Sequence, residues 1–206
     1  MFCVKGHEFD IDPNWAHLSA FIDADSAVGL LRTCWSLEIH AIPRTIIVPA
    51  VGDQSPVKLA PRVQLDCLQF TVSDWRALTG VHHTFSDDIR GGWLLCSEWE
   101  SFTHLKLAFG LVRDRSITVE LDGIGLHESW PQLLGSEVPF NMSASVLFTG
   151  VGLYTPPNVT DPTAHALSRL RHNLPDYRFE PPKIEELRHE AGYYGCHVLF
   201  PPTPSA

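Results

Sequence analysis

Alternation between apolar and polar residues along several stretches of the chain predicts β-strands that bury one face. Val63, Leu65 and Cys67, for example, are separated by Gln64 and Asp66, as expected for a strand with one dry and one wet side. Such runs, bounded by Gly, Pro and short polar residues, are typical of strands. The expected strands span residues 37–42, 44–48, 63–72, 93–99, 102–112, 116–126, 143–154 and 196–200.

Apolar residues at helical spacing predict several amphipathic helices among these strands. Asp12-Pro13 and Asp161-Pro162 are each typical of a helix start, because Asp accepts a hydrogen bond at the N-cap and Pro is tolerated at the first helical position. Pro182 is interpreted as the start of a last helix. The expected helices follow Asp12-Pro13 and cover about 24–34, 73–80, 162–174 and 183–191.

A short internal repeat links the segments 116–127 and 143–154. In each copy the apolar residues keep one parity up to a glycine, Gly123 or Gly150, and then change to the other parity. A strand changes the residues that face the core only by inserting an unpaired residue, so the pattern predicts a β-bulge near each glycine. The two strands are expected to be neighbours in one sheet.

These patterns predict an α+β fold, a mainly antiparallel bent sheet with amphipathic helices packed on one side. Antiparallel pairing is favoured because the strands of a doubly wound parallel sheet would be apolar throughout. We expect a single domain over residues 1–206, with a helix-rich amino-terminal part over 1–61. A β-rich part over 62–200 would contain the helices near 162–174 and 183–191, and residues 201–206 are expected to form a disordered tail.

Charge and targeting features narrow the classes of function. With 15 Lys and Arg against 24 Asp and Glu, the formal net charge is −9, which argues against binding to a nucleic-acid backbone. No secretory signal and no apolar run long enough for a membrane span is visible. The 5 cysteines lack a C-x-x-C pair and are expected as reduced thiols in the core of a cytoplasmic protein.

Metal binding and acid–base catalysis each have one candidate group of residues. His82, His83, Asp87 and Asp88 are possible metal ligands, but adjacent histidines on a strand point to opposite faces and the segment is also typical of a polar turn. The interpretation as a turn is favoured, and no cofactor is expected. No nucleophile elbow, phosphate-binding loop or dinucleotide motif is present.

Glu98 and Glu100 are separated by one residue on an expected strand. They would share a face and form a pair of carboxylates. Solvated surface acids are the simpler interpretation, because no companion acid or sugar-binding pattern accompanies them.

A polar corner is expected where the two copies of the repeat end. His127 and Glu128 end the first copy and Tyr154 ends the second, with Trp130 in the loop that follows. Bulges often redirect side chains beside binding sites, so this corner is the first candidate for a small-molecule pocket. The alternative is a hydrogen-bonded strand end with Trp130 packed on the core.

The leading hypothesis is a non-enzymatic protein-binding domain, most specifically an immunity protein that neutralises a basic toxin in a bacterial competition system. It depends on the acidic charge, the 6 tryptophans and the lack of catalytic motifs. The alternatives are a metal-dependent enzyme or small-ligand binder at the His127, Glu128 and Tyr154 corner, and a structural subunit that pairs through a sheet edge. The chain is expected to be a monomer or a small homo-oligomer. The expected partner-binding residues are Trp130, Glu128, His127, Tyr154, Glu98 and Glu100.

Overall fold

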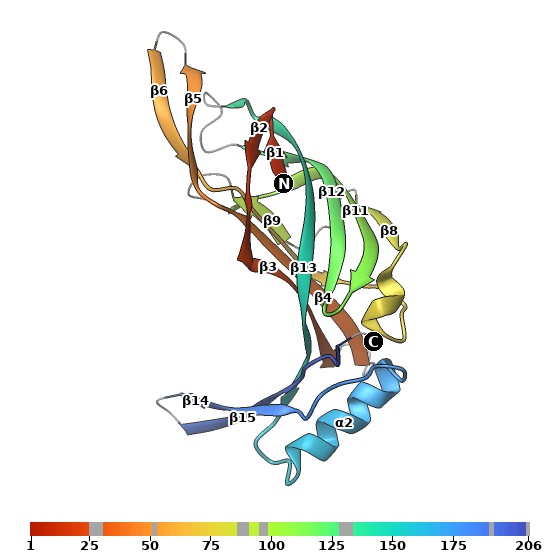
Figure 1. Cartoon of the computed structure of the whole chain (residues 1–206). Coiled ribbons are helices and arrows are strands. Elements are labelled where there is room, and N and C mark those ends of the chain that lie inside the picture. Colours follow the sequence, from red (N-terminus) through yellow and green to blue (C-terminus); the bar gives the residue numbers. More distant parts are fainter. Residues whose placement is uncertain are drawn as a thin grey trace.

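A curved 13-stranded sheet forms the body of the computed structural model (Figure 1). The structure describes residues 1–24, 31–50, 53–85, 91–94, 99–127, 134–189 and 192–204. The main path of the sheet runs β10-β9-β7-β4-β3-β13-β12-β11-β8, with β1, β2, β14 and β15 attached off this path. The strands are β1 (Phe2–Val4), β2 (His7–Phe9), β3 (Ile11–Ala24), β4 (Leu31–Ala41), β5 (Arg44–Ala50), β6 (Asp53–Leu59), β7 (Arg62–Leu68), β8 (His82–Phe85), β9 (Gly91–Leu94), β10 (Trp99–Glu100), β11 (Phe102–Arg113), β12 (Ser116–Leu126), β13 (Glu137–Thr155), β14 (Lys183–His189) and β15 (Gly192–Phe200).

The chain is mostly β, with 66% of its residues in strands, so the predicted α+β class is wrong. The described residues contain one α-helix, α2 (Pro162–Asn173), and one 3₁₀ turn, η1 (Trp75–Leu78). Both lie within predicted helices. The other helices were predicted wrongly: residues 13–22 belong to β3, residues 31–34 to β4 and residues 183–189 to β14, whereas residues 25–30 lie outside the described residues. The amino-terminal part is therefore β-rich, not helix-rich.

Pairing within the sheet explains why the segment after Asp12-Pro13 is extended. Ala16, Leu18, Ala20 and Ile22 are all buried, so the segment also has the two-residue period of a strand. β3 lies between β4, its antiparallel partner, and β13, to which it pairs in parallel. Hydrogen bonds to strands on both sides satisfy its backbone, and this long-range pairing overrides the local helix signal.

The repeated segments lie on adjacent strands of one sheet, as predicted, and the strands are antiparallel, so that residues 143–147 of the second copy pair with the first. β12 and β13 pair without interruption from Ser116 opposite Leu147 to Leu126 opposite Glu137. The predicted bulge at Gly150 is confirmed, because the register against β3 shifts between Phe148 and Gly150, where Gly150 has φ +126°. The buried parity of β13 changes at this point.

The bulge predicted within β12 near Gly123 is wrong, because the register shift opposite Ile124 and Gly125 has its extra residue, Thr103, on β11. Pairing of β12 with β13 continues through Gly123, and Gly123 and Gly125 keep the buried parity of the residues before them. A Cβ atom at Gly125 would lie 2.1 Å from the Trp93 ring. The absence of a side chain at this position makes room for an aromatic ring in the core.

Three fully buried tryptophans organise the core: Trp35, Trp75 and Trp93. Trp93 stacks on Phe140 with ring centroids 5.6 Å apart, and Trp75 stacks on Phe148 at 4.8 Å. α2 packs its buried residues, Ala166 and Leu170, over one end of the sheet (Figure 1). Of the cysteines in the described residues, Cys34 and Cys196 are buried, and Cys3 and Cys67 are partly buried.

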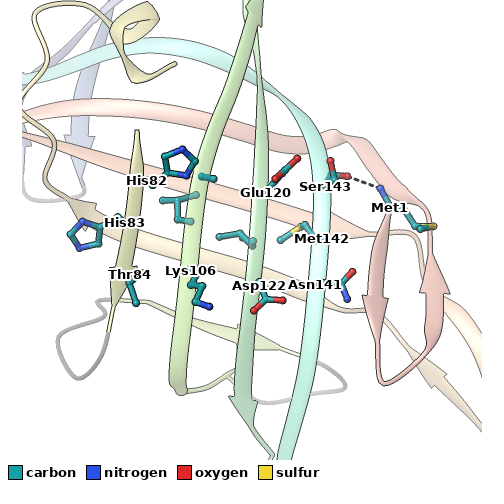
Figure 2. A pocket seen from close by; sticks show the side chains of 13 residues that line it. Met1, His82, His83, Thr84, Lys106, Glu120, Asp122, Asn141, Met142 and Ser143 are labelled. Atoms are coloured by element: carbon teal, nitrogen blue, oxygen red, sulfur yellow. Dashed lines mark hydrogen bonds between the residues drawn. The ribbon is translucent and has the colours of Figure 1, made fainter. Parts of the chain in front are cut away.

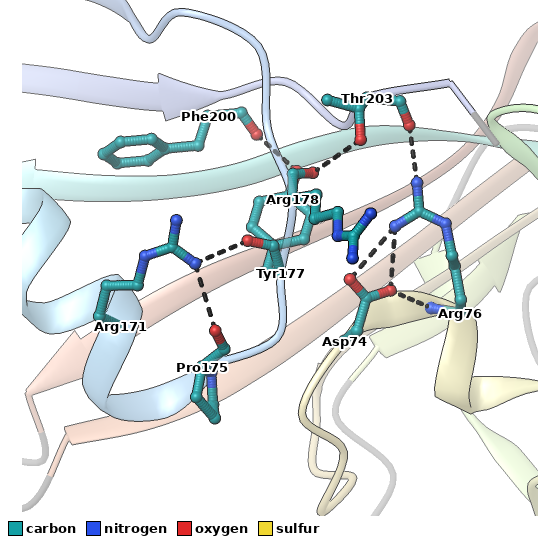
Figure 3. Close-up of polar contacts among 8 residues, drawn as sticks. All are labelled: Asp74, Arg76, Arg171, Pro175, Tyr177, Arg178, Phe200 and Thr203. Atoms are coloured by element: carbon teal, nitrogen blue, oxygen red, sulfur yellow. Dashed lines mark hydrogen bonds and ion pairs between the residues drawn. The ribbon is translucent and has the colours of Figure 1, made fainter. Parts of the chain in front are cut away.

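The carboxy-terminal residues 201–204 are anchored, contrary to the predicted disorder. The Arg76 guanidinium donates to the Thr203 carbonyl oxygen at 2.7 Å and is held by Asp74 (Figure 3). Tyr177 donates its hydroxyl to the Phe200 carbonyl oxygen at 2.7 Å, and burial raises the pKa of this hydroxyl far above its usual value. The hydroxyl therefore stays protonated, as its role as donor requires.

Two hairpins project from the ends of the sheet. β5 and β6 form a separate two-stranded sheet at one end, and β14 and β15 project at the end where α2 lies (Figure 1).

Candidate binding face

One face of the sheet over β3, β4 and β7 carries mainly polar side chains, and we call it the open face. Leu18, Leu37 and Leu65 point to the core, so the residues next to each of them along the strand lie on the opposite side. Cross-strand pairs place His17, Glu38 and Gln64 in one row across the three strands. The open face over these strands includes Trp15, His17, Ser19, Ser36, Glu38, His40, Arg62, Gln64 and Asp66, and the paired residues Phe21 and Cys34 have the same parity.

Trp15 lies flat on His40 on this face. The ring centroids are 4.9 Å apart and the planes are 7° from parallel. His40 is buried, and its Nε2 donates to Glu38 Oε1 at 2.7 Å. Burial lowers the pKa of His40 more than Glu38 raises it, so the imidazole that supports Trp15 is neutral near pH 7. Trp15 is fixed from below but 49% exposed.

A second exposed tryptophan lies across the strands from Trp15. The Trp99 ring rests on Gly92, where a Cβ atom would lie 3.6 Å from Trp99 Cε3. Trp99 pairs with Leu94, which pairs with Arg62, so Trp99 lies in the cross-strand row that contains Arg62 and His40. A hollow of about 290 Å³ beside the ring is lined in part by Gln64, Asp66 and Trp99. Trp99 is 49% exposed, the same as Trp15.

Hydrogen bonds fix a polar strip alongside the row that joins the two tryptophans. Ser36 Oγ donates to Asp66 Oδ1 at 2.7 Å, and Gln64 Nε2 donates to Asp66 Oδ2 at 2.9 Å. These side chains lose little further freedom when a partner covers them, which lowers the cost of binding. Two half-exposed tryptophans, Trp15 and Trp99, therefore lie next to polar side chains that are already held in place. This combination is typical of protein contact sites.

A groove of about 450 Å³ crosses β8, β11, β12 and β13 on the same side of the sheet (Figure 2). Ala108 has His82 as its neighbour on one side and Glu120 on the other. Lys106 and Asp122 form the adjacent cross-strand pair. The small Ala108 side chain between longer polar ones hollows the surface, and the lining offers donors and acceptors to a polar group.

The predicted metal ligands do not form a cluster in the described part of the chain. His82 pairs with Ala108 and His83 with Leu107, so the two imidazoles lie on opposite sides of β8. Asp87 and Asp88 lie outside the described residues. Within the described ranges, no group of three or more His, Cys, Asp and Glu side chains is arranged to hold a metal ion.

The predicted corner is not assembled, because β12 and β13 are antiparallel. Leu126, before His127, pairs with Glu137 at the start of β13, whereas Tyr154 pairs with His197 near the end of β13. His127 and Tyr154 thus lie toward opposite ends of the long strand. Glu128, Trp130 and Glu98 lie outside the described residues.

Two of the predicted partner-binding residues instead form a contact inside the protein. His127 is 2% exposed, and its Nδ1 lies 3.5 Å from Glu100 Oε2. The Glu100 side chain is itself largely buried. These two side chains contact each other rather than present a surface, whereas the Tyr154 side chain is exposed.

Comparison with family models, curated proteins and solved structures finds no match for this chain. In the part that the structure describes, no helix combines the length and the apolar character needed to span a bilayer.

Proposed function

We propose that the protein is a non-enzymatic binding protein that holds a protein partner on its open face. The observation that carries the proposal is the stack of Trp15 on His40, which fixes a large aromatic ring while leaving half of it exposed. Tryptophan is enriched among the residues that dominate binding energy at interfaces. Trp99 supplies a second anchor beside the same polar strip.

Charge favours a basic partner. The chain has a net charge of −9, and a field of one sign speeds the encounter with a partner of opposite charge. A basic toxin, neutralised by being bound, is the narrower form of this proposal. The proposed site is the strip beside Trp15 and Trp99, not the corner at His127 and Tyr154.

The test is recovery and titration of the partner with matched variants. Tagged wild-type protein is used to isolate proteins from the cells that produce it, and a protein recovered in stoichiometric amount is identified and purified. Trp15→Ala and Trp99→Ala are each expected to weaken its binding by about 2 kcal/mol, roughly 30-fold in Kd. Leu111→Ala serves as the control, because Leu111 is also an exposed apolar side chain but lies on β11.

Both tryptophan variants are expected to keep the wild-type fold, checked by their circular dichroism spectra, because each side chain lies half exposed on the surface of the sheet. The proposal is wrong if no protein is retained in stoichiometric amount, or if the tryptophan variants bind the partner as tightly as Leu111→Ala does.

A further inference from the structure

The outer edge of β14 is a free sheet edge. In the sheet as described, β14 pairs with β15 alone, so half of its backbone N–H and C=O groups face away from any strand. The hairpin projects from the body of the molecule (Figure 1). Such an edge is a template for pairing with another strand.

The sequence of β14 makes this edge complementary to itself. Charge changes sign across Leu187, from Glu186 to Arg188. If two copies of β14 pair antiparallel with Leu187 at the centre, Glu186 of each copy lies opposite Arg188 of the other. Opposite charges facing each other across strands are stabilising, and the two-fold axis produces the favourable pair twice. A parallel arrangement in the same register would place Glu186 opposite Glu186, which is unfavourable.

The side chains needed for this contact are on the surface. Glu186 and Arg188 are 58% and 74% exposed, and they already form an ion pair within the strand, with Nη2 and Oε2 2.6 Å apart. Exposed Ile184 and Tyr194 add apolar area on the same hairpin. A hollow of about 460 Å³ lined by Glu185, Glu186, Leu187, Arg188 and Tyr194 lies along it.

We propose that two copies of the chain associate through antiparallel pairing of their β14 strands, which continues the sheet across a two-fold axis. Charged residues usually protect a sheet edge, because identical copies present like charges to each other. In β14 the order of the charges turns this repulsion into attraction, but only when the two strands are antiparallel. The same residues therefore select both the partner, a second copy, and the direction of pairing.

Charge reversal provides the test. Sedimentation over a range of protein concentrations is expected to give a dimer for the wild type, weakened by added salt because its ion pairs are screened. Glu186→Arg and Arg188→Glu each place like charges in opposition twice, so each should raise the dimer dissociation constant roughly tenfold or more. The double variant Glu186→Arg/Arg188→Glu restores both pairs and should dimerise again.

A mixture of the two single variants gives the most specific result. The edge of the Glu186→Arg chain carries positive charge at both positions, and the edge of the Arg188→Glu chain carries negative charge at both. Opposite charges would then face each other twice, so two variants that are each monomeric should form a heterodimer. Glu120→Arg is the control, because Glu120 is an exposed acid on β12. Its dissociation constant should match that of the wild type.

A wild type that stays monomeric at every concentration overturns the proposal, as does a single variant that dimerises as well as the wild type. Failure of the double variant or of the mixture to dimerise overturns the proposed register. The variants of β14 leave Trp15 and Trp99 unaltered, so the partner proposed above should bind each of them normally. The two proposals can therefore fail separately.

Discussion

The two copies of the internal repeat use their glycines differently. In β13, Gly150 has φ +126° and forms the bulge at which the buried parity changes. In β12, the equivalent Gly123 lies in continuous pairing with β13. The second glycines are alike, because Gly125 lies under the Trp93 ring and Gly152 under the His197 ring. The second glycines of the two copies are thus equivalent in structure, whereas the first glycines are equivalent only in sequence.

This difference shows what a repeated spacing inside one chain can and cannot specify. A glycine removes a side chain and permits unusual backbone angles, but it requires neither. At Gly150 the structure depends on the backbone freedom of glycine, because φ is positive. At Gly125 it depends on the missing side chain, because the Trp93 ring occupies that space. Substitutions at the glycines separate these two uses.

The largest effect is expected for Gly150→Ala. A φ of +126° is poorly tolerated by alanine, at a cost of about 1–3 kcal/mol, and the new Cβ would lie 2.5 Å from the Phe200 backbone oxygen. We expect a loss of at least about 3 kcal/mol in the free energy of unfolding. Denaturant titration measures it, and a loss below about 1 kcal/mol contradicts the bulge.

A smaller loss, of about 2–3 kcal/mol, is expected for Gly125→Ala. The new Cβ would lie 2.1 Å from the buried Trp93 ring, which stacks on Phe140 and donates from Nε1 to the Leu126 carbonyl oxygen at 2.7 Å. Because the obstacle is a side chain, Gly125→Ala should add little to Trp93→Ala in the double variant. Gly150→Ala has a backbone obstacle, so it should add its full cost to Trp93→Ala. Full additivity at Gly125 would show that the ring does not need the space.

The smallest effect in the series is expected for Gly123→Ala, at about 1 kcal/mol. Its Cβ would approach the Phe140 ring at 2.9 Å and the His104 carbonyl oxygen at 2.9 Å, without a positive φ. The same denaturant titration measures the loss. A cost as large as that of Gly150→Ala would mean that both first glycines have the same role, contrary to the pairing of β12.

Part of the fold was predictable, because most strands have strict alternation. The two Asp-Pro sequences show where the prediction stopped. Asp161 caps α2 by accepting from the Ala164 N–H at 2.9 Å, as predicted. Asp12 accepts from the Asn14 N–H at 3.0 Å, next to a register shift within β3 rather than at a helix start. The local chemistry is the same, and only the distant strands β4 and β13 decide the outcome.

The binding face was less predictable than the fold, because it depends on which strands are neighbours. Trp15 and Trp99 were visible as tryptophans, but their exposure follows from strand parity and from the ring seat at Gly92. Once residues 15–22 are assigned to a strand, alternation predicts that Leu18 and Ile22 face the core and that Trp15 lies on the other face of the sheet. His127, chosen as a surface residue, is buried because Gly123 and Gly125 continue the core parity up to it.

Because β3 pairs with β13, which lies far along the chain, β3 is synthesised long before one of its two partner strands. β3 ends at Ala24, and its partners on β13 begin at Leu147, so the ribosome adds roughly 120 residues in between at about 5–20 residues per second. For several seconds the emerging strand lacks one of its two neighbours, and an unpaired apolar strand attracts mistaken partners. We expect chaperone supply during translation, rather than the stability of the finished protein, to limit the yield of folded chains.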